Sequence, residues 1–101
     1  EFHRVDSKRH NYHLLVGRMK NGKRDKFIDK MFTEKRIKCV TQYYPLYRYD
    51  YYKKSGLGNA DCPNTDLFFD NMVSFPFQEW MSDEDFDYVL EAAIDVLGSL
   101  R

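Results

Sequence analysis

Cysteine is scarce in this chain of 101 residues, which has only Cys39 and Cys62, 23 positions apart. A small secreted scaffold normally depends on more cysteines than this, at spacings that suit disulfides. Cys39 lies in an apolar, strand-like segment, and we expect its thiol to be buried. The cysteine content therefore favours a cytoplasmic protein.

Long apolar runs are also missing. No stretch approaches the roughly 18 residues that cross a bilayer, and no signal-peptide pattern opens the chain. We therefore expect no membrane partner. The first ten residues are mostly polar and charged. We expect residues 1–10 to form an N-terminal arm or boundary and residues 11–101 to form one domain.

The chain has no motif that would give it a chemistry of its own. The run from Gly56 to Gly58 lacks the third glycine of a dinucleotide loop, and no strand precedes it. The acidic run that starts at Asp83 lacks the glycine and the closing glutamate of a calcium loop. No cysteine or carboxylate joins His3, His10 and His13 in a tetrahedral metal set. We therefore predict no catalytic residue and no metal site.

Charge of one sign is not in excess overall, since the net charge is zero. The two halves nevertheless differ. Residues 1–54 hold 15 Lys and Arg against 6 Asp and Glu, a net of +9, and residues 55–101 hold 1 against 10, a net of −9. One interpretation is that the halves neutralise each other in the folded domain. The other is a basic face for phosphates or nucleic acid, provided that the basic groups cluster in space.

Tyrosine is abundant in one short segment, where residues 42–52 contain six of them. Tyrosine combines a large apolar ring with a hydroxyl that needs a partner when buried. Six such rings cannot all enter one small core, so we expect about half to pack inside and the others to line a site or a partner surface. Tyr47, Tyr49 and Tyr51, with Arg48, would suit stacking on bases. They would equally suit the wall of a pocket for a sugar or nucleotide, with Arg48 on a phosphate.

Hydrophobic periodicity predicts an α+β fold, with a small sheet of about three strands packed with three to four helices. Apolar residues on both faces of the first strand predict a strand that is covered on both sides. Pro63 suits the first turn of a helix, whose inward stripe we expect to be Leu67, Phe68 and Met72. The predicted strands or extended pieces are 11–19, 37–41 and 73–76, and the predicted helices are 24–35, 47–54 and one that begins at Pro63.

The last helix has the clearest signals. Ser82 followed by Asp85 resembles a capping box, and acidic residues in the first turns suit the helix dipole. One apolar face then continues for five turns, and we expect it to be buried. Its members are Phe86, Val89, Leu90, Ala93, Val96, Leu97 and Leu100.

Several motifs occur together in a distinctive order. They are Tyr12-His-Leu-Leu-Val16, Ile37-Lys-Cys-Val-Thr-Gln-Tyr-Tyr-Pro-Leu46, Cys62-Pro63, Val73-Ser-Phe-Pro76 and the run from Ser82 to Val89. In this order and spacing, over roughly residues 10–100, the chain resembles the C-terminal small domain of the DegT/StrS sugar aminotransferases. That resemblance implies the aminotransferase small-domain fold. It also implies an enzyme that depends on pyridoxal phosphate (PLP) and aminates keto groups on nucleotide-linked sugars.

The resemblance also implies where substrate is bound. The family has a His-Tyr-Pro-type turn near the active-site mouth, followed by a Pro-Leu-His step. Gln42 and Tyr47 stand where the family has histidines. By resemblance, Gln42, Tyr43 and Arg48 are the substrate-binding residues of this chain, which would form one wall of the substrate cleft.

The cofactor lysine, the acid that pairs with the pyridinium nitrogen and the phosphate site belong, in the family, to a large domain that precedes the small one. We therefore expect this chain to be inactive and free of PLP without that large domain, and the full-length enzyme to be a homodimer. The apolar faces of the first strand suggest a surface made for a neighbour, through which the chain would self-associate. The alternatives are a stand-alone nucleic-acid-binding module and a scaffold that keeps the fold but has lost the site.

Overall fold

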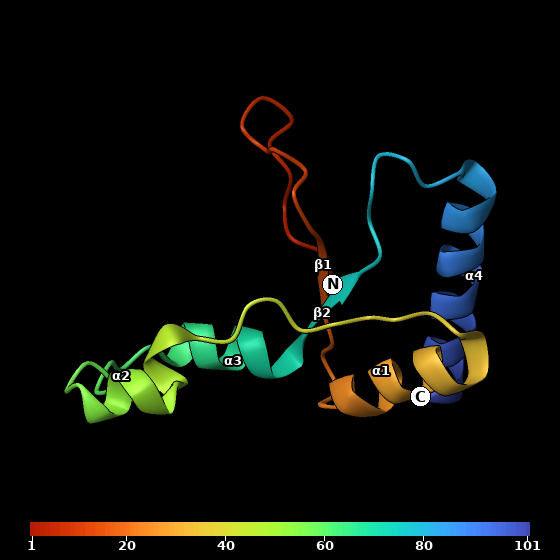
Figure 1. The fold of residues 1–101 in the computed structure, drawn as a ribbon. Coiled ribbons are helices and arrows are strands. Elements are labelled where there is room, and N and C mark those ends of the chain that lie inside the picture. Colours follow the sequence, from red (N-terminus) through yellow and green to blue (C-terminus); the bar gives the residue numbers. More distant parts are fainter.

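The protein is described by a computed structural model that covers residues 1–101. It is an α+β structure with four α-helices, one 3-10 turn and a two-stranded sheet (Figure 1), and this confirms the predicted fold class. None of the helices is both long and apolar enough to cross a membrane. In chain order the elements are β1 (Leu15–Arg18), α1 (Arg24–Lys35), η1 (Leu46–Arg48), α2 (Asp50–Lys54), α3 (Pro63–Asn71), β2 (Met72–Phe75) and α4 (Asp83–Ser99).

The sheet pairs β1 with β2 in antiparallel register, so that Leu15 lies opposite Phe75. The segment 37–41, predicted as a strand, is extended chain that meets the sheet at one bridge only. There the Val40 N–H donates to the Ser74 carbonyl at 3.0 Å, and the Val40 carbonyl accepts from the Ser74 N–H at 2.8 Å. The pairing ends soon afterwards, before Pro45, which has no N–H to contribute to a ladder. The predicted third strand is thus reduced to a single pair.

The first residues lie along the outer edge of β1. Phe2 forms a bridge with Gly17, and the Arg18 N–H donates to the Glu1 carbonyl at 2.7 Å. Gly17 leaves room for this crossing, because a Cβ there would lie 3.3 Å from the ring of Phe75 and 3.5 Å from the ring of Phe2. The strand predicted from residue 11 begins only at Leu15, since the preceding residues form a loop that projects away from the sheet (Figure 1).

Two histidines tie the base of this loop to β1. The Tyr12 N–H donates to His10 Nδ1 at 2.9 Å, so His10 carries its proton on Nε2. That N–H faces His3 Nε2 at 2.9 Å, and His3 Nδ1 in turn lies 3.3 Å from the Val16 carbonyl oxygen. A domain boundary at residue 10 stays a prediction.

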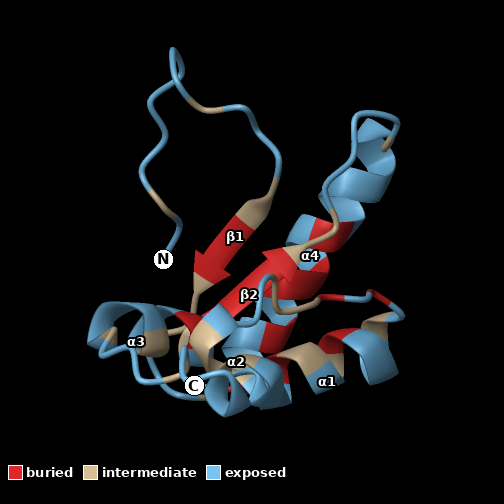
Figure 2. Ribbon diagram, turned by 60° about the vertical axis from the view of Figure 1, so that its left-hand side comes forward, coloured by how far each residue is buried: buried red, intermediate tan, exposed pale blue.

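The main core lies between β2, α1 and α4, whose facing sides are buried (Figure 2). A smaller cluster, formed by Val16, Phe69 and Met72, joins β1 to α3. Phe27 and Met31 of α1 are fully buried, since residues four positions apart lie on one side of the helix, whereas Phe32 is 55% exposed. The other members of the main core are Ile37, Cys39, Val73, Val89, Ala92, Ala93, Val96 and Leu100.

The capping signal of α4 is confirmed, because the Asp85 N–H donates to Ser82 Oγ at 3.1 Å. The predicted buried face is only half correct. Val89, Ala93, Val96 and Leu100 are buried, but a parallel stripe on the same helix is exposed. The reason is that α1 and the sheet cover one side of the predicted face and no element covers the other (Figure 2). The exposed stripe consists of Phe86, Leu90, Ile94 and Leu97.

The predicted inward stripe of α3 is wrong at two of its three positions. Leu67 and Phe68 are exposed, at 57% and 41%, whereas Met72 is buried. The residue that enters the core is Phe69, at 8% exposed. Its ring is covered by Tyr44 and by the guanidinium groups of Arg24 and Arg48, and these contacts fix which side of α3 faces inward.

Candidate functional site

The tyrosines of the segment 42–52 meet edge to face. The Tyr44 ring lies 5.3 Å from that of Phe69 at 89°, and 4.9 Å from that of Tyr49 at 77°. The Tyr51 and Tyr52 rings are 5.4 Å apart at 82°. This T-shaped arrangement packs the segment onto α3 and itself. It does not offer the parallel row of rings that a stacking ladder for bases would use.

Arg48 is held by two carboxylates of α3. Its Nε donates to Asp66 Oδ1 at 2.8 Å, and its Nη1 donates to Asp70 Oδ1 at 2.7 Å. The guanidinium also lies over the Phe69 ring, 5.4 Å from its centroid. The N–H donors of the Arg48 guanidinium are thus engaged by carboxylates of the same domain. Arg48 thereby joins η1 to α3.

The same cluster includes Tyr47, whose hydroxyl donates to Asp66 Oδ1 at 2.7 Å. This hydrogen bond, followed by those from Arg48, lowers the pKa of Asp66, and it raises the pKa of Tyr47 to about 12. The hydrogen bonds from Arg48 likewise lower the pKa of Asp70. The cluster therefore keeps its charges near neutral pH and stabilises one arrangement of the tyrosine segment.

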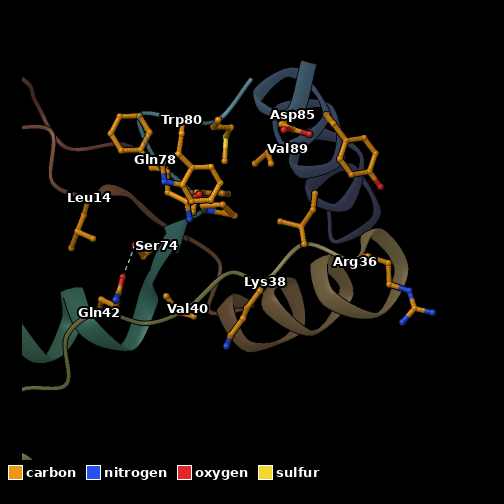
Figure 3. A pocket seen from close by; sticks show the side chains of 16 residues that line it. Leu14, Arg36, Lys38, Val40, Gln42, Ser74, Gln78, Trp80, Asp85 and Val89 are labelled. Atoms are coloured by element: carbon orange, nitrogen blue, oxygen red, sulfur yellow. Dashed lines mark hydrogen bonds between the residues drawn. The ribbon is translucent and has the colours of Figure 1, made fainter. Parts of the chain in front are cut away.

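Gln42 lies in a different place, where the extended chain after α1 passes β2. The Ser74 hydroxyl donates to Gln42 Oε1 at 3.3 Å (Figure 3), and Ser74 itself is buried at 2% exposed. With its oxygen engaged in this way, the Gln42 amide N–H₂ is free to donate. Tyr43, which follows Gln42, is 65% exposed.

Gln42 lines a pocket of about 540 Å³. The pocket is bounded by the chain that leads from α1 to Gln42, the end of β2, the loop 76–82 and the first turns of α4. In Figure 3, Gln78 and Trp80 gather on one side, and Asp85 and Val89 lie across from them on α4. The lining combines aromatic and aliphatic surface with side-chain amides, as binding sites for small polar molecules do.

The lining of the pocket includes the Ser74 hydroxyl but no imidazole or thiol. The Ser74 hydroxyl is engaged with Gln42. In the whole chain, no group of three or more His, Cys, Asp or Glu side chains is placed to hold a metal ion.

The structure therefore separates the three predicted site residues. Gln42 lines the pocket and Tyr43 lies exposed beside it, whereas Arg48 lies in the cluster with α3. The sequence reasoning missed the loop 76–82. A signal was available there, because the only tryptophan of the chain, Trp80, lies in this loop between the last strand and the capping box.

Ion pairs join the basic and acidic halves of the chain. Arg48 pairs with Asp66 and Asp70, and Lys35 pairs with Asp95. Other basic groups pair locally, as Lys30 does with Glu34 at 3.0 Å. This pattern favours mutual neutralisation of the two halves. A nucleic-acid-binding role stays a prediction.

The sequence of this chain is similar to part of a known protein. SpsC, a spore coat polysaccharide biosynthesis protein of Bacillus subtilis strain 168, is 32% identical to the chain over 97 residues. The match covers 91% of this chain and 25% of that protein. The chain thus spans about a quarter of the length of this relative.

Solved structures of a putative sugar aminotransferase of Streptococcus pneumoniae, Spr1654, have a similar fold. Its PMP form matches with a TM-score of 0.77 and 26% identity, over 88% of this chain and 23% of that one. Its PLP form matches with a TM-score of 0.76 and the same identity and coverage. Residues 1–94 match the DegT/DnrJ/EryC1/StrS aminotransferase family, and the chain belongs to that family.

Proposed function

We propose that this chain is the C-terminal domain of a PLP-dependent aminotransferase that acts on nucleotide-linked keto-sugars. In this role it forms one wall of the substrate cleft, and the remaining wall comes from a large domain outside the chain. The process it serves is the synthesis of a polysaccharide, as the name of SpsC suggests. We place the enzyme in the cytoplasm, in line with its low cysteine content.

The observation that carries the proposal is a family match over residues 1–94 together with coverage of only about a quarter of each relative. A domain of this size is commonly one part of a longer chain. The solved structures of Spr1654 include a PLP form and a PMP form. They support PLP as the cofactor of the full-length enzyme.

The residues of this chain do not fit PLP on their own. Lys38, the one lysine that lines the Gln42 pocket, turns its amine away from Trp80 and Gln78 (Figure 3). Other lysines are engaged elsewhere, as Lys35 is with Asp95 and Lys23 is with the Leu100 carbonyl. PLP supplies the carbanion chemistry of amino transfer. We assign the lysine that binds PLP and the site for the PLP phosphate to the large domain. We also propose that the full-length enzyme is a homodimer.

Gln42 and Tyr43 are the groups we assign to the sugar nucleotide. Ser74 fixes the Gln42 amide at the pocket edge, and its free N–H₂ donates to a sugar hydroxyl or a phosphate oxygen. The Tyr43 hydroxyl adds a second partner, and its exposed ring shields the sugar from water. Arg48 acts from further away, because it holds the tyrosine segment against α3 and so positions Tyr43.

The proposal is tested by replacing the matching quarter of SpsC with this chain. We expect the chimera to bind one equivalent of PLP and to convert it to PMP with an amino donor such as glutamate. Gln42→Ala in the chimera should raise KM for the sugar nucleotide about tenfold, as loss of one good hydrogen bond does, with little change in PLP content.

Tyr51→Phe is the matched control, because Tyr51 is 73% exposed and does not line the pocket. It should leave KM unchanged. The isolated chain, mixed with PLP, should give no stoichiometric absorbance band of bound cofactor. A band that saturates at one equivalent and disappears when a single lysine of this chain is replaced would overturn the proposal. So would a folded chimera in which Gln42→Ala and Tyr51→Phe behave alike.

A further inference from the structure

The extended chain that follows α1 has two different sides. Ile37 and Cys39 enter the main core, at 6% and 4% exposed, because successive side chains of an extended chain point in opposite directions. The alternate residues all line the Gln42 pocket, and they are Arg36, Lys38, Val40 and Gln42. One wall of this pocket is therefore a row of side chains with a charged end and an amide end.

The charged end of this row is not neutralised within the chain. Arg36 and Lys38 are exposed, and neither side chain takes part in an ion pair. The only acid that lines the pocket is Asp85. With two cationic side chains and one acidic side chain, the lining has a net positive charge, which favours an anionic ligand.

Trp80 presents a free aromatic face to the same pocket. Its side chain is 78% exposed, more than that of any other large hydrophobic residue, and its ring contacts no other aromatic ring. The Met81 N–H donates to the Gln78 carbonyl at 3.1 Å, which closes a turn around Trp80. This turn lies between β2 and the Ser82 cap of α4, so both of its ends are held. A free aromatic ring on a held turn suits stacking on the flat face of a base.

Asp85 indicates which part of a ligand lies at the indole. It lies on α4, across the pocket from Trp80 (Figure 3). Its carboxylate accepts N–H groups, such as those of a base, and repels phosphate. Lys38 turns its amine away from Trp80 (Figure 3), so a phosphate bound to that amine lies apart from the indole. A base therefore suits the Trp80 end of the pocket, and phosphate suits the row that contains Lys38.

We propose that the nucleotide part of the substrate lies in this pocket in one direction. Its base stacks on Trp80, its diphosphate binds Lys38 and Arg36, and the sugar attached to it reaches Gln42. Four residues of extended chain span about 13 Å, so the row from Lys38 to Gln42 leaves room for the sugar beyond the phosphates. Trp80 and Lys38 thus determine specificity for the nucleotide, whereas Gln42 recognises the sugar. This inference rests on the proposed function, which supplies a nucleotide-linked sugar as the ligand.

Titration of the isotope-labelled chain with UDP, followed by NMR, tests the proposal. Since Trp80 is the only tryptophan, one indole N–H signal reports contact at its ring. UDP should shift that signal and the backbone amide of Lys38 together, with a dissociation constant on the order of millimolar. Uridine, which has no phosphate, should shift the indole signal alone and bind about tenfold more weakly. Inorganic pyrophosphate should shift the Lys38 amide alone.

Variants separate the two contacts. Lys38→Gln should raise the dissociation constant of UDP about tenfold and leave that of uridine unchanged. Lys26→Gln, at an exposed lysine outside the pocket, should change neither constant. Trp80→Leu should raise the constant of UDP about tenfold, read at the Lys38 amide, and Trp80→Phe should restore most of the affinity. Gln42→Ala should leave the constant of UDP unchanged, because UDP lacks the sugar that Gln42 recognises.

An indole signal that UDP leaves in place at tens of millimolar would overturn the proposal. Equal effects of Lys38→Gln and Lys26→Gln would also overturn it. So would a loss of UDP affinity in Gln42→Ala, because that loss would mean the opposite direction of binding. Far-UV circular dichroism checks that every variant keeps its helices.

The outcome is separate from that of the proposed function. None of these measurements involves PLP, whereas the SpsC chimera is judged by its conversion of PLP to PMP before any sugar nucleotide is added. A chimera that makes PMP, beside a chain whose indole ignores UDP, would contradict only the direction of binding proposed here.

Discussion

At the residue scale, the two cysteines show how burial changes the chemical reactivity of a thiol. Cys39 is 4% exposed in the main core, and burial raises the pKa of its thiol from 9.0 to about 11. Cys62 lies just before α3 and is partly exposed. Both are free thiols. Since the thiolate is the reactive form, the two should differ widely in reactivity.

Thiol labelling tests this difference. At mildly alkaline pH in native buffer, iodoacetamide should modify Cys62 readily and leave Cys39 unmodified, and in denaturant it should modify both. Mass spectrometry of tryptic peptides reads the two sites separately. Equal labelling of both sites in the native protein would contradict the buried position of Cys39.

Cys39 also makes stability depend on pH. Its folded pKa is above its unfolded pKa, so the contribution of this thiol to stability is complete below about pH 9 and is lost as pH rises towards about 11. The free energy of unfolding, measured in urea across that range, should fall. For Cys39→Ala, the free energy of unfolding should fall less steeply with pH. For Cys62→Ala, it should fall as it does in the parent chain.

Some residue roles follow from sequence and others do not. Ser82 was predictable as a helix cap, because a cap acts within three residues of itself. Phe69 was not, because it is adjacent to Phe68 and periodicity allows either ring to face inward. The choice is made by Tyr44, Arg24 and Arg48, which are distant in sequence.

At the scale of elements, Phe69 joins α3 to the rest of the molecule. It is the one buried aromatic residue of this helix, and it contacts the tyrosine segment on one side and the cluster with Val16 and Met72 on the other. The ion pairs from Arg48 to Asp66 and Asp70 lie beside it. Phe69 and the Arg48 guanidinium are thus the centre of the contacts that anchor α3, with Arg24 and Tyr47 beside them.

Replacing that ring should therefore be costly. Phe69→Ala should lower the free energy of unfolding by about 3 kcal/mol or more, since it opens a cavity at a buried aromatic position. Phe68→Ala, at the exposed neighbour, should cost less than about 1 kcal/mol. Urea unfolding followed by circular dichroism measures both values. Similar values for the two variants would show that α3 faces the core differently.

Elements with strong local signals were predictable. The helix over 24–35 was predicted at its observed bounds, and the last helix at its observed start after Ser82, because amphipathic spacing and a cap are local properties. The segment 37–41 has strand-like residues but forms only one bridge. Sheet pairing depends on what lies alongside, and sequence pattern does not contain that information.

At the scale of the whole molecule, the chain is open. Its radius of gyration is 15.6 Å, whereas a compact domain of 100 residues has about 13 Å. The loop before β1 projects from the middle of the structure, and the short helix α2 lies at the end far from α4 (Figure 1). Only 16 of the 101 residues are buried, and these lie mainly around β2, α1 and α4.

Hydrogen exchange should follow this distribution. Amides of α1, β2 and the buried side of α4 should exchange slowest, and those of α2 and of residues 4–13 fastest, because local opening costs little where few apolar contacts are broken. Exchange followed by mass spectrometry of peptides measures the order. Protection of α2 equal to that of α4 would contradict it.

The site could be predicted only in part, because it is formed by segments that are far apart in the sequence. Gln42 was named by resemblance to a family motif that is continuous in sequence, and it lines the pocket, while its role in substrate binding stays a prediction. The pocket itself needs the end of β2, the loop 76–82 and the first turns of α4 to meet the chain after α1. Trp80 stands out in the sequence as the only tryptophan, but its place in the pocket comes from the meeting of these distant segments.

Trp80 gives the protein a built-in optical reporter. It is the only indole in the sequence, it is 78% exposed, and it lines the Gln42 pocket. Its fluorescence in the free chain should have the red-shifted maximum of an indole in water. Any sugar nucleotide or neighbouring polypeptide that covers the pocket should shift that maximum to the blue, so occupancy can be followed without a label.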